Sequence, residues 1–392
     1  MIHAPPAGRP ALLPTLAAMT WLQALVALAL FAPGAVAPSA RLDIPSLSMF
    51  STAVFAVGVF TSFWTGGLIN RLGSLRMASL CAGAVVASMT FAAFGSGSAL
   101  LLAGFCLGLA FGPETPASTA LLGKLVTDER RALVFSLRQT GNQIGAVCGS
   151  LALPAIAIWL APQWSYAAVA ACAIFGIVVF EWLRPGYEGM AQAPPQLDMR
   201  ARLALVSSDR RIAALAAASM PFSGMQLALN TCFVTLGVRD LGLSHLEAGG
   251  ALACAQAGGL LGRLGWGFLA MRINSARLVL ISLGLGMAVC AAVFGLWGDI
   301  LGKLGQYALA AVFGLTASGW NGVFLAEVAR LALQDRIGET TGAVLTASYA
   351  GLLVTPFLIS AIETLVGLAG AFVGLAILAF AGTAALLRGY SR

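Results

Sequence analysis

Two arginines lie inside apolar stretches that are long enough to cross a membrane. Arg138 stands in LVFSLRQTGNQIGAVCGSLALP, and Arg263 stands in ALACAQAGGLLGRLGWGFLA. A charged side chain at the centre of a membrane helix costs about 2.5–3.5 kcal/mol even on the gentlest insertion scale, so such a residue usually has a function. A guanidinium group binds a carboxylate through two parallel charge-assisted hydrogen bonds. The two arginines therefore predict a polar site for a small anion.

Further side chains at helical spacing extend this predicted site. Asn142 follows Arg138 by four residues and Gln256 precedes Arg263 by seven, so each shares a helix face with its arginine. Trp266 follows Arg263 by three residues and could stack on its guanidinium. Each further polar residue could instead bond to the backbone of a neighbouring helix. The other predicted substrate-binding residues interrupt two more apolar stretches: Gln226, Asn230, Trp320 and Asn321.

Glu114 has two interpretations. It stands between Pro113 and Pro116, which remove backbone hydrogen bonds and predict a locally open helix. A carboxylate shielded from water can take up a proton, which makes Glu114 the candidate for proton coupling. Alternatively, Glu114 forms a permanent ion pair with Arg138, because both residues are expected at comparable depth on consecutive helices. Arg138 then contacts substrate, pairs with Glu114, or bends its side chain toward the membrane surface.

The composition indicates an integral membrane protein. Of 392 residues, 59% are hydrophobic and 9% are charged, which leaves too little polar surface for a soluble domain of this length. The apolar runs are 20 or more residues long, so they predict helices rather than the ~10-residue alternating strands of a membrane barrel. We predict an all-α protein with twelve transmembrane helices, at 11–33, 46–69, 76–95, 98–123, 131–160, 164–183, 211–237, 246–271, 277–297, 303–330, 337–361 and 366–387.

The basic residues predict the orientation of these helices. An even number of spans places both termini on one side. Seventeen of the 22 lysines and arginines then fall on the side of the termini, and Arg41, Arg239 and Lys303 fall on the other. The positive-inside rule therefore predicts that both termini are cytoplasmic. Because the basic residues are scattered singly at span ends, the net charge of +7 does not predict a nucleic-acid partner.

One long polar interruption, 184–210, divides the chain into two predicted six-helix bundles, 1–183 and 211–392. The halves repeat each other at a displacement of about 200 residues, and in this repeat Trp320-Asn321 corresponds to Glu114-Thr115. Two bundles related by an axis along the membrane normal form the architecture of large alternating-access carriers, whose substrate sites lie near the membrane midplane. The repeat is clearest in one cytoplasmic turn: Gly67, Arg71 and Arg76 in the first half are answered by Gly267, Arg272 and Arg277 in the second.

This turn resembles the loop motif of the major facilitator superfamily, and the resemblance covers the whole chain. FGPETPAS, FSLRQTGNQIG, GRLGWG and GWNGVFLAEVARLA resemble bacterial permeases related to the cyanate-type and the oxalate- or monocarboxylate-type carriers. The resemblance implies a twelve-helix carrier of the bacterial inner membrane, monomeric and without a cofactor. It also implies that Arg263 is a ligand of the substrate carboxylate. The sequence departs from the loop motif at Asn70 and Met271, where the family usually has an acid.

We therefore expect a secondary active transporter that moves a small organic anion of the carboxylate type, coupled to protons or by exchange. The alternative is an exporter of hydrophobic or cationic compounds, against which the buried arginines argue. Short loops and the lack of an attached soluble module argue against a receptor that does not transport. No phosphate-loop, HExxH, GxSxG or CxxC pattern occurs, so neither an enzyme nor a metal site is expected. The expected partners are the anion, protons and the lipid bilayer.

Overall fold

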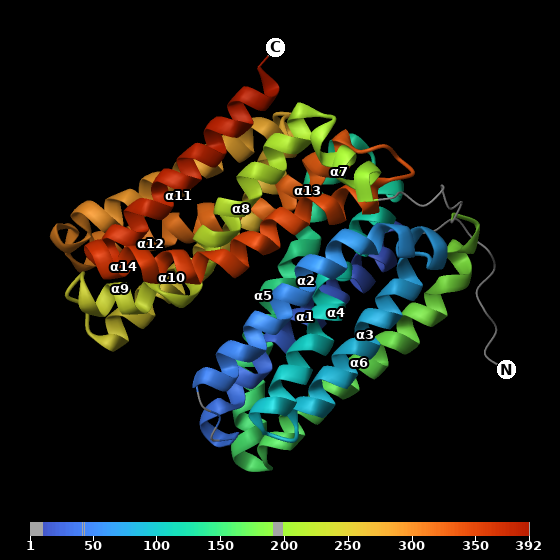
Figure 1. Cartoon of the computed structure of the whole chain (residues 1–392), viewed down its shortest axis with the longest axis horizontal. Helices are drawn as coiled ribbons and strands as arrows, with labels where there is room; N and C mark the ends of the chain where they lie inside the picture. The colour runs from blue at the N-terminus through green and yellow to red at the C-terminus, as the bar shows by residue number, and fades with distance from the viewer. Residues whose placement is uncertain (1–10, 41, 43, 191–198, 392) are drawn as a thin grey trace. The chain divides into compact units, whose positions relative to one another are not determined.

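The computed structural model describes residues 11–40, 42, 44–190 and 199–391, and within these ranges the chain is helical (Figure 1). Hydrocarbon offers no partner for backbone N–H and C=O groups, so a spanning segment must satisfy them internally, as a helix does. The first half consists of α1 (Leu12–Ala40), α2 (Ile44–Leu72), α3 (Ser74–Ala92), α4 (Gly97–Leu125), α5 (Asp128–Trp159) and α6 (Pro162–Leu183).

The predicted linker contains two short helical pieces, η1 (Arg184–Met190) and α7 (Met199–Ser207). The residues 191–198 between them lie outside the described ranges. The second half consists of α8 (Arg210–Thr231), α9 (Phe233–Arg239), α10 (His245–Arg272), α11 (Ala276–Trp297), η2 (Gly298–Leu301), α12 (Gly302–Ala317), α13 (Trp320–Leu331) and α14 (Ile337–Tyr390).

These helices correspond to the twelve predicted spans. Nine stretches of the described chain are long and apolar enough to cross a membrane, and two of these, Ala276–Leu331 and Ile337–Tyr390, hold two spans each. The 28-residue α10 supplies the remaining span. An unbroken α14 would be about 80 Å long, more than twice the ~30 Å hydrocarbon core. It breaks at Gly367, whose φ of 77° favours glycine. The twelve-helix arrangement predicted from the sequence is confirmed.

Two of the spans are interrupted, and one expected local opening is absent. The seventh span, predicted over 211–237, is divided into α8 and α9 at Cys232. The tenth span, predicted over 303–330, is divided into α12 and α13 at Ser318-Gly319. The helix that carries Glu114 is not opened by its two prolines, because α4 continues through both. Within this continuous helix, Ser118 Oγ donates to the Glu114 carbonyl at 2.9 Å.

The described residues form two compact units. Unit 1 comprises Met1–Thr127, Arg138–Arg202 and Ala332–Thr346, and unit 2 comprises Asp128–Leu137, Leu203–Leu331 and Ala347–Arg392. The first turns of α5 thus pack in unit 2 and those of α14 pack in unit 1. In unit 1, α2 and α3 pack on α4, and α6 packs on α1 and α3. In unit 2, α12 packs on α10 and α11.

Glycines set the close approach of α10 and α12 in unit 2. A Cβ atom built on Gly314 would lie well under 3.0 Å from the carbonyl oxygen of Ala255, and one on Gly258 would meet the carbonyl of Ala311 equally closely. Real Cβ atoms essentially never approach other atoms so closely. In lipid there is no hydrophobic driving force between helices, so they associate through close van der Waals packing, which small residues at such crossings allow. Arg263 is therefore carried on a helix whose position is fixed by backbone contact.

Replacing Gly314 with alanine should lower the thermal stability of the purified protein in detergent. The added methyl group would meet backbone rather than a flexible side chain, and overpacking of this kind costs about 1–3 kcal/mol. The matched control is Gly265→Ala, because nothing lies within 4 Å of a Cβ at Gly265. The control should be neutral or slightly stabilising. Equal melting temperatures for the two variants would contradict the packing account.

Candidate functional site

Arg138 and Glu114 form a buried ion pair inside unit 1. Their exposed fractions are 1% and 4%. Nη2 of Arg138 donates to Oε1 of Glu114 and to Oγ of Ser118, the latter at 3.2 Å. The hydroxyl of Thr115 donates to the second carboxylate oxygen at 2.7 Å. Of the alternatives that the sequence left open for Arg138, the structure contains the pair with Glu114.

Helices α1, α4 and α5 position this pair. A Cβ atom on Gly141 or Gly145 would clash with backbone carbonyls of α1, so α5 lies directly against α1. Asn142 is half-buried one turn beyond Arg138 and is not part of the pair. Nε of Arg138 is buried and has no hydrogen-bond partner among the described residues. The guanidinium therefore retains one donor that a bound acceptor could use.

Four of the predicted polar residues form two hydrogen-bonded pairs in unit 2. Nδ2 of Asn321 donates to Oε1 of Gln226 at 3.0 Å, which joins α13 to α8. Nε2 of Gln256 donates to Oδ1 of Asn230 at 2.8 Å, which joins α10 to α8. These side chains thus bond to each other across helices. They form a polar region around α8 in an otherwise apolar unit.

Arg263 belongs to the same unit and is completely buried on α10, with an exposed fraction of 1%. The adjacent Gly262 packs against the carbonyl of Leu315, so this face of α10 lies on α12. Trp266, predicted to stack on Arg263, donates its indole N–H to the same Leu315 carbonyl at 2.9 Å. That bond fixes Trp266 to α12.

Trp320 carries a buried donor that no described residue accepts. Its side chain is 1% exposed and makes edge contacts with Phe222 and Phe324, at centroid distances of 5.6 and 5.1 Å. Its Nε1 has no hydrogen-bond partner among the described residues. The preceding Gly319 packs against Gly262, so the chain beside Trp320 lies against the chain beside Arg263. A buried unmade hydrogen bond costs about 1–3 kcal/mol, so this donor could be used by a bound acceptor.

The two copies of the loop motif have different surroundings. In the second half, Arg272 lies over the ring of Phe268 at 5.1 Å and Arg277 over the ring of Tyr390 at 4.9 Å. Gly267 packs against Ser136 at the start of α5. In the first half, Gly67 is buried, whereas Arg71 and Arg76 are exposed and line a pocket. The arginines of this repeated turn therefore pack on aromatic rings in the second half and line a pocket in the first half.

The burial of two carboxylates was not predicted from the sequence, which favours a gate or surface position for Glu327. Glu327 accepts from Arg330 at 2.7 Å and from the Tyr390 hydroxyl at 2.5 Å, and its exposed fraction is 1%. Glu339 pairs with Arg336 at 2.9 Å and is buried against Gly66. Both pairs have i,i+3 spacing near helix ends, which is a detectable signal. The burial of the carboxylates depends on distant segments and has no such signal.

Comparison with known proteins adds the following. A family model described as Major Facilitator Superfamily matches residues 15–356. No curated protein matches. A solved bacterial homologue of the iron transporter ferroportin, in an outward-facing state, is 16% identical with a TM-score of 0.77, and the match covers 97% of this chain and 99% of that one. The human organic anion transporter MFSD10 gives 18% identity, TM-score 0.75 and coverage of 97% and 100%. The E. coli fucose:proton symporter is 14% identical with a TM-score of 0.70, and the match covers 96% of this chain and 98% of that one.

Breaking the Arg138–Glu114 pair on one side should destabilise the protein strongly. Removing one partner of a buried pair leaves an uncompensated charge and costs about 3–5 kcal/mol. We therefore expect Glu114→Leu and Arg138→Met each to lower the melting temperature more than the double variant does. Arg239→Gln, which breaks an exposed pair with Glu363, serves as control and should cost at most about 1 kcal/mol. Additive losses in the double variant would show that the two side chains are not coupled.

Proposed function

The chain belongs to the Major Facilitator Superfamily, and we propose that it moves a small organic anion of the carboxylate type across the membrane by alternating access. Members of this family are membrane transport proteins rather than enzymes, and the chain is a multi-pass membrane protein. The proposal places it in the bacterial inner membrane as a monomer with both termini in the cytoplasm. The resemblance to oxalate- and monocarboxylate-type permeases points in the same direction and stays a prediction.

The observation that carries the proposal is the buried guanidinium of Arg263 in a unit that also holds the unmatched indole donor of Trp320. Both groups offer N–H donors to an acceptor, and a guanidinium adds a full positive charge. A hydrogen bond to a charged group contributes about 1.5–3 kcal/mol. A carboxylate therefore suits these donors, and a cationic compound would be repelled. The amides of Gln226, Gln256 and Asn321 provide further polar contacts around the substrate.

The Arg138–Glu114 pair supports coupling to protons. Its guanidinium is already neutralised, so a substrate carboxylate that bound to Arg138 would compete with Glu114. Protonation of Glu114 would remove this competition and leave the guanidinium to the substrate. The buried net charge would then be the same before and after binding, which avoids the cost of an extra charge in a low-dielectric interior. If transport occurs by exchange, a second substrate anion replaces the first one at the site.

Two of the solved relatives have printed names that fit this scheme, since one is an organic anion transporter and another a fucose:proton symporter. At their low identity they support the fold of this chain, and their substrates are analogies only. The argument for an anion therefore depends on Arg263 and Trp320. The first experiment is a thermal-shift panel of oxalate, lactate, nitrate and the cationic drug ethidium on the purified protein.

Arg263→Gln should reduce uptake of the carboxylate that stabilises the wild type most, measured in proteoliposomes at equal protein content. Loss of one charged hydrogen-bonding group predicts a decrease of about 10–100-fold. Arg239→Gln removes an exposed arginine and should leave uptake unchanged. Unchanged uptake by Arg263→Gln would remove this residue from the site. Stabilisation and transport of ethidium in place of carboxylates would favour the alternative, an exporter of cationic compounds.

Uptake by the wild type should rise as the pH on the substrate side falls, because substrate binding is accompanied by protonation of Glu114. In Glu114→Gln the side chain can no longer take up a proton, so the uptake rate should become nearly independent of pH. The measurement is initial uptake between pH 5 and 8 in proteoliposomes with a fixed internal pH. If Glu114→Gln retained the wild-type pH profile, the pair would be structural only.

A further inference from the structure

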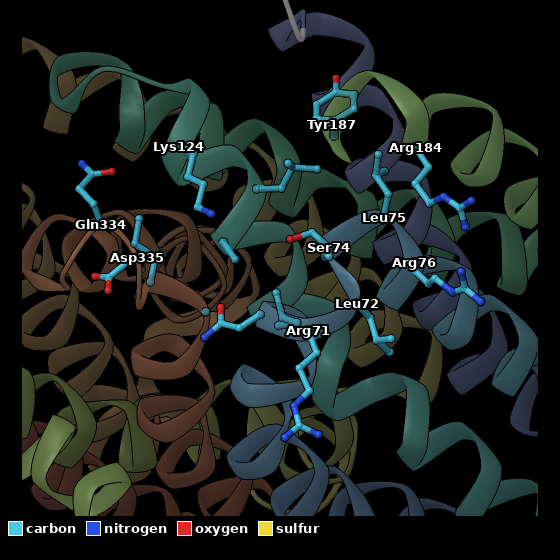
Figure 2. Close-up of a pocket in the computed structure, with 17 residues that line it drawn as sticks. Arg71, Leu72, Ser74, Leu75, Arg76, Lys124, Arg184, Tyr187, Gln334 and Asp335 are labelled. Atoms are coloured by element: carbon cyan, nitrogen blue, oxygen red, sulfur yellow. The ribbon is translucent and has the colours of Figure 1, made fainter. Parts of the chain in front are cut away.

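A cavity of about 280 Å³ opens in unit 1 at the turn between α2 and α3 (Figure 2). It is lined by the end of α2, the first turn of α3, the end of α4, η1 and the residues around the start of α14. None of the residues assigned to substrate or proton binding lines it. Its place at the end of a membrane span puts it at the level of lipid headgroups, where dissolved ions also have access.

The lining of this cavity is strongly basic. Four cationic side chains contribute to it and only one carboxylate, that of Asp335. Arg71 and Arg76 line the cavity and form no ion pair with any described residue, and Figure 2 shows their guanidinium groups directed away from Lys124 and Ser74. The amine of Lys124 and the hydroxyl of Ser74 point toward each other across it. The fourth cation, Arg184, is held by Glu181 at 2.6 Å.

The start of α3 adds backbone donors to this lining. Gly73 is the N-cap, with φ 83°, and no side chain caps the helix. The N–H groups of Ser74, Leu75 and Arg76 therefore face the cavity end of the helix without an intrahelical acceptor. The N-terminus of a helix also carries a partial positive charge. The buried Nδ2 atom of Asn70, another lining residue, has no hydrogen-bond partner in the described chain.

In the second half of the chain, the corresponding cations contact aromatic rings or a carboxylate. There the corresponding arginines lie on aromatic rings, and Glu327 neutralises Arg330 at 2.7 Å. In the repeat that matches Glu114 with Trp320, Glu327 corresponds to Leu121 and Arg330 corresponds to Lys124. Both Leu121 and Lys124 line the open cavity. The first half thus keeps the cations and has a leucine in place of the acid.

We propose that this cavity binds a phosphate group, either free phosphate or the phosphate of an anionic lipid headgroup. Several oxygens and up to two charges suit a site that combines backbone N–H groups with lysine and arginine. The volume of about 280 Å³ lies just below the range for ligand pockets, about 300–1,000 Å³, and so fits one such group rather than a drug-sized molecule.

The test measures melting of the full-length protein in detergent against sodium phosphate, with sodium chloride at equal ionic strength as reference, and in nanodiscs of phosphatidylcholine with or without phosphatidylglycerol. Phosphate, phosphatidylglycerol or both should stabilise the wild type. The double variant Arg71→Gln/Arg76→Gln should weaken the apparent affinity at least tenfold. The matched control, Arg272→Gln in the second half, should not. Arg263→Gln should also keep the effect, which separates this site from the proposed substrate site.

A second variant distinguishes loss of the anion site from misfolding of the protein. Leu121→Glu introduces the acid that the second half has, so it should abolish stabilisation by the anion while the protein melts at or above the wild-type temperature without it. A response to phosphate identifies the free ion as a ligand, and a response to phosphatidylglycerol alone identifies the lipid. If neither stabilises the wild type, or if Arg71→Gln/Arg76→Gln and Leu121→Glu keep the full effect, the proposal is wrong.

Discussion

Glu114 supplies a counter-charge to the buried Arg138 guanidinium, within hydrogen-bonding distance inside one helical unit. Moving an unpaired ion out of water costs several kcal/mol even after relaxation, so the two helices that carry the pair must stay together. Thr115 and Ser118 complete the hydrogen bonds of the pair, and α1 holds α5 from behind through Gly141 and Gly145. A substrate anion that uses Arg138 therefore has to displace Glu114, which makes a proton part of the proposed transport step.

The two halves place their buried carboxylates at different levels of corresponding helices. In the first half the acid is Glu114, in the middle of α4, and in the second half it is Glu327, near the end of α13. The middle of the second-half helix has Trp320, with an unmatched donor, and the corresponding end of the first-half helix has Leu121 beside an open basic cavity. The divergence of one repeat thus leaves a neutral residue at two positions where the other half has an acid, and we assign an anion to each place.

The sequence predicts the spans well, because long apolar runs have one stable backbone solution in lipid. It does not predict the break at Cys232, where neither proline nor glycine stands. It misleads at Pro113 and Pro116, since α4 continues through both residues. For Arg138 the sequence gives the correct partner as one alternative and cannot choose it, because side-chain direction depends on packing. The contact between Glu327 and Tyr390 has no local pattern at all.

Proton uptake on substrate binding tests most directly whether the substrate and Glu114 compete for the Arg138 guanidinium, as proton-coupled transport requires here. The carboxylate that gives the largest thermal stabilisation is added to purified protein in weakly buffered detergent solution containing a pH indicator. The account predicts uptake of about one proton per bound substrate in the wild type and none in Glu114→Gln. Binding to the wild type without proton uptake, or equal uptake by Glu114→Gln, would contradict it.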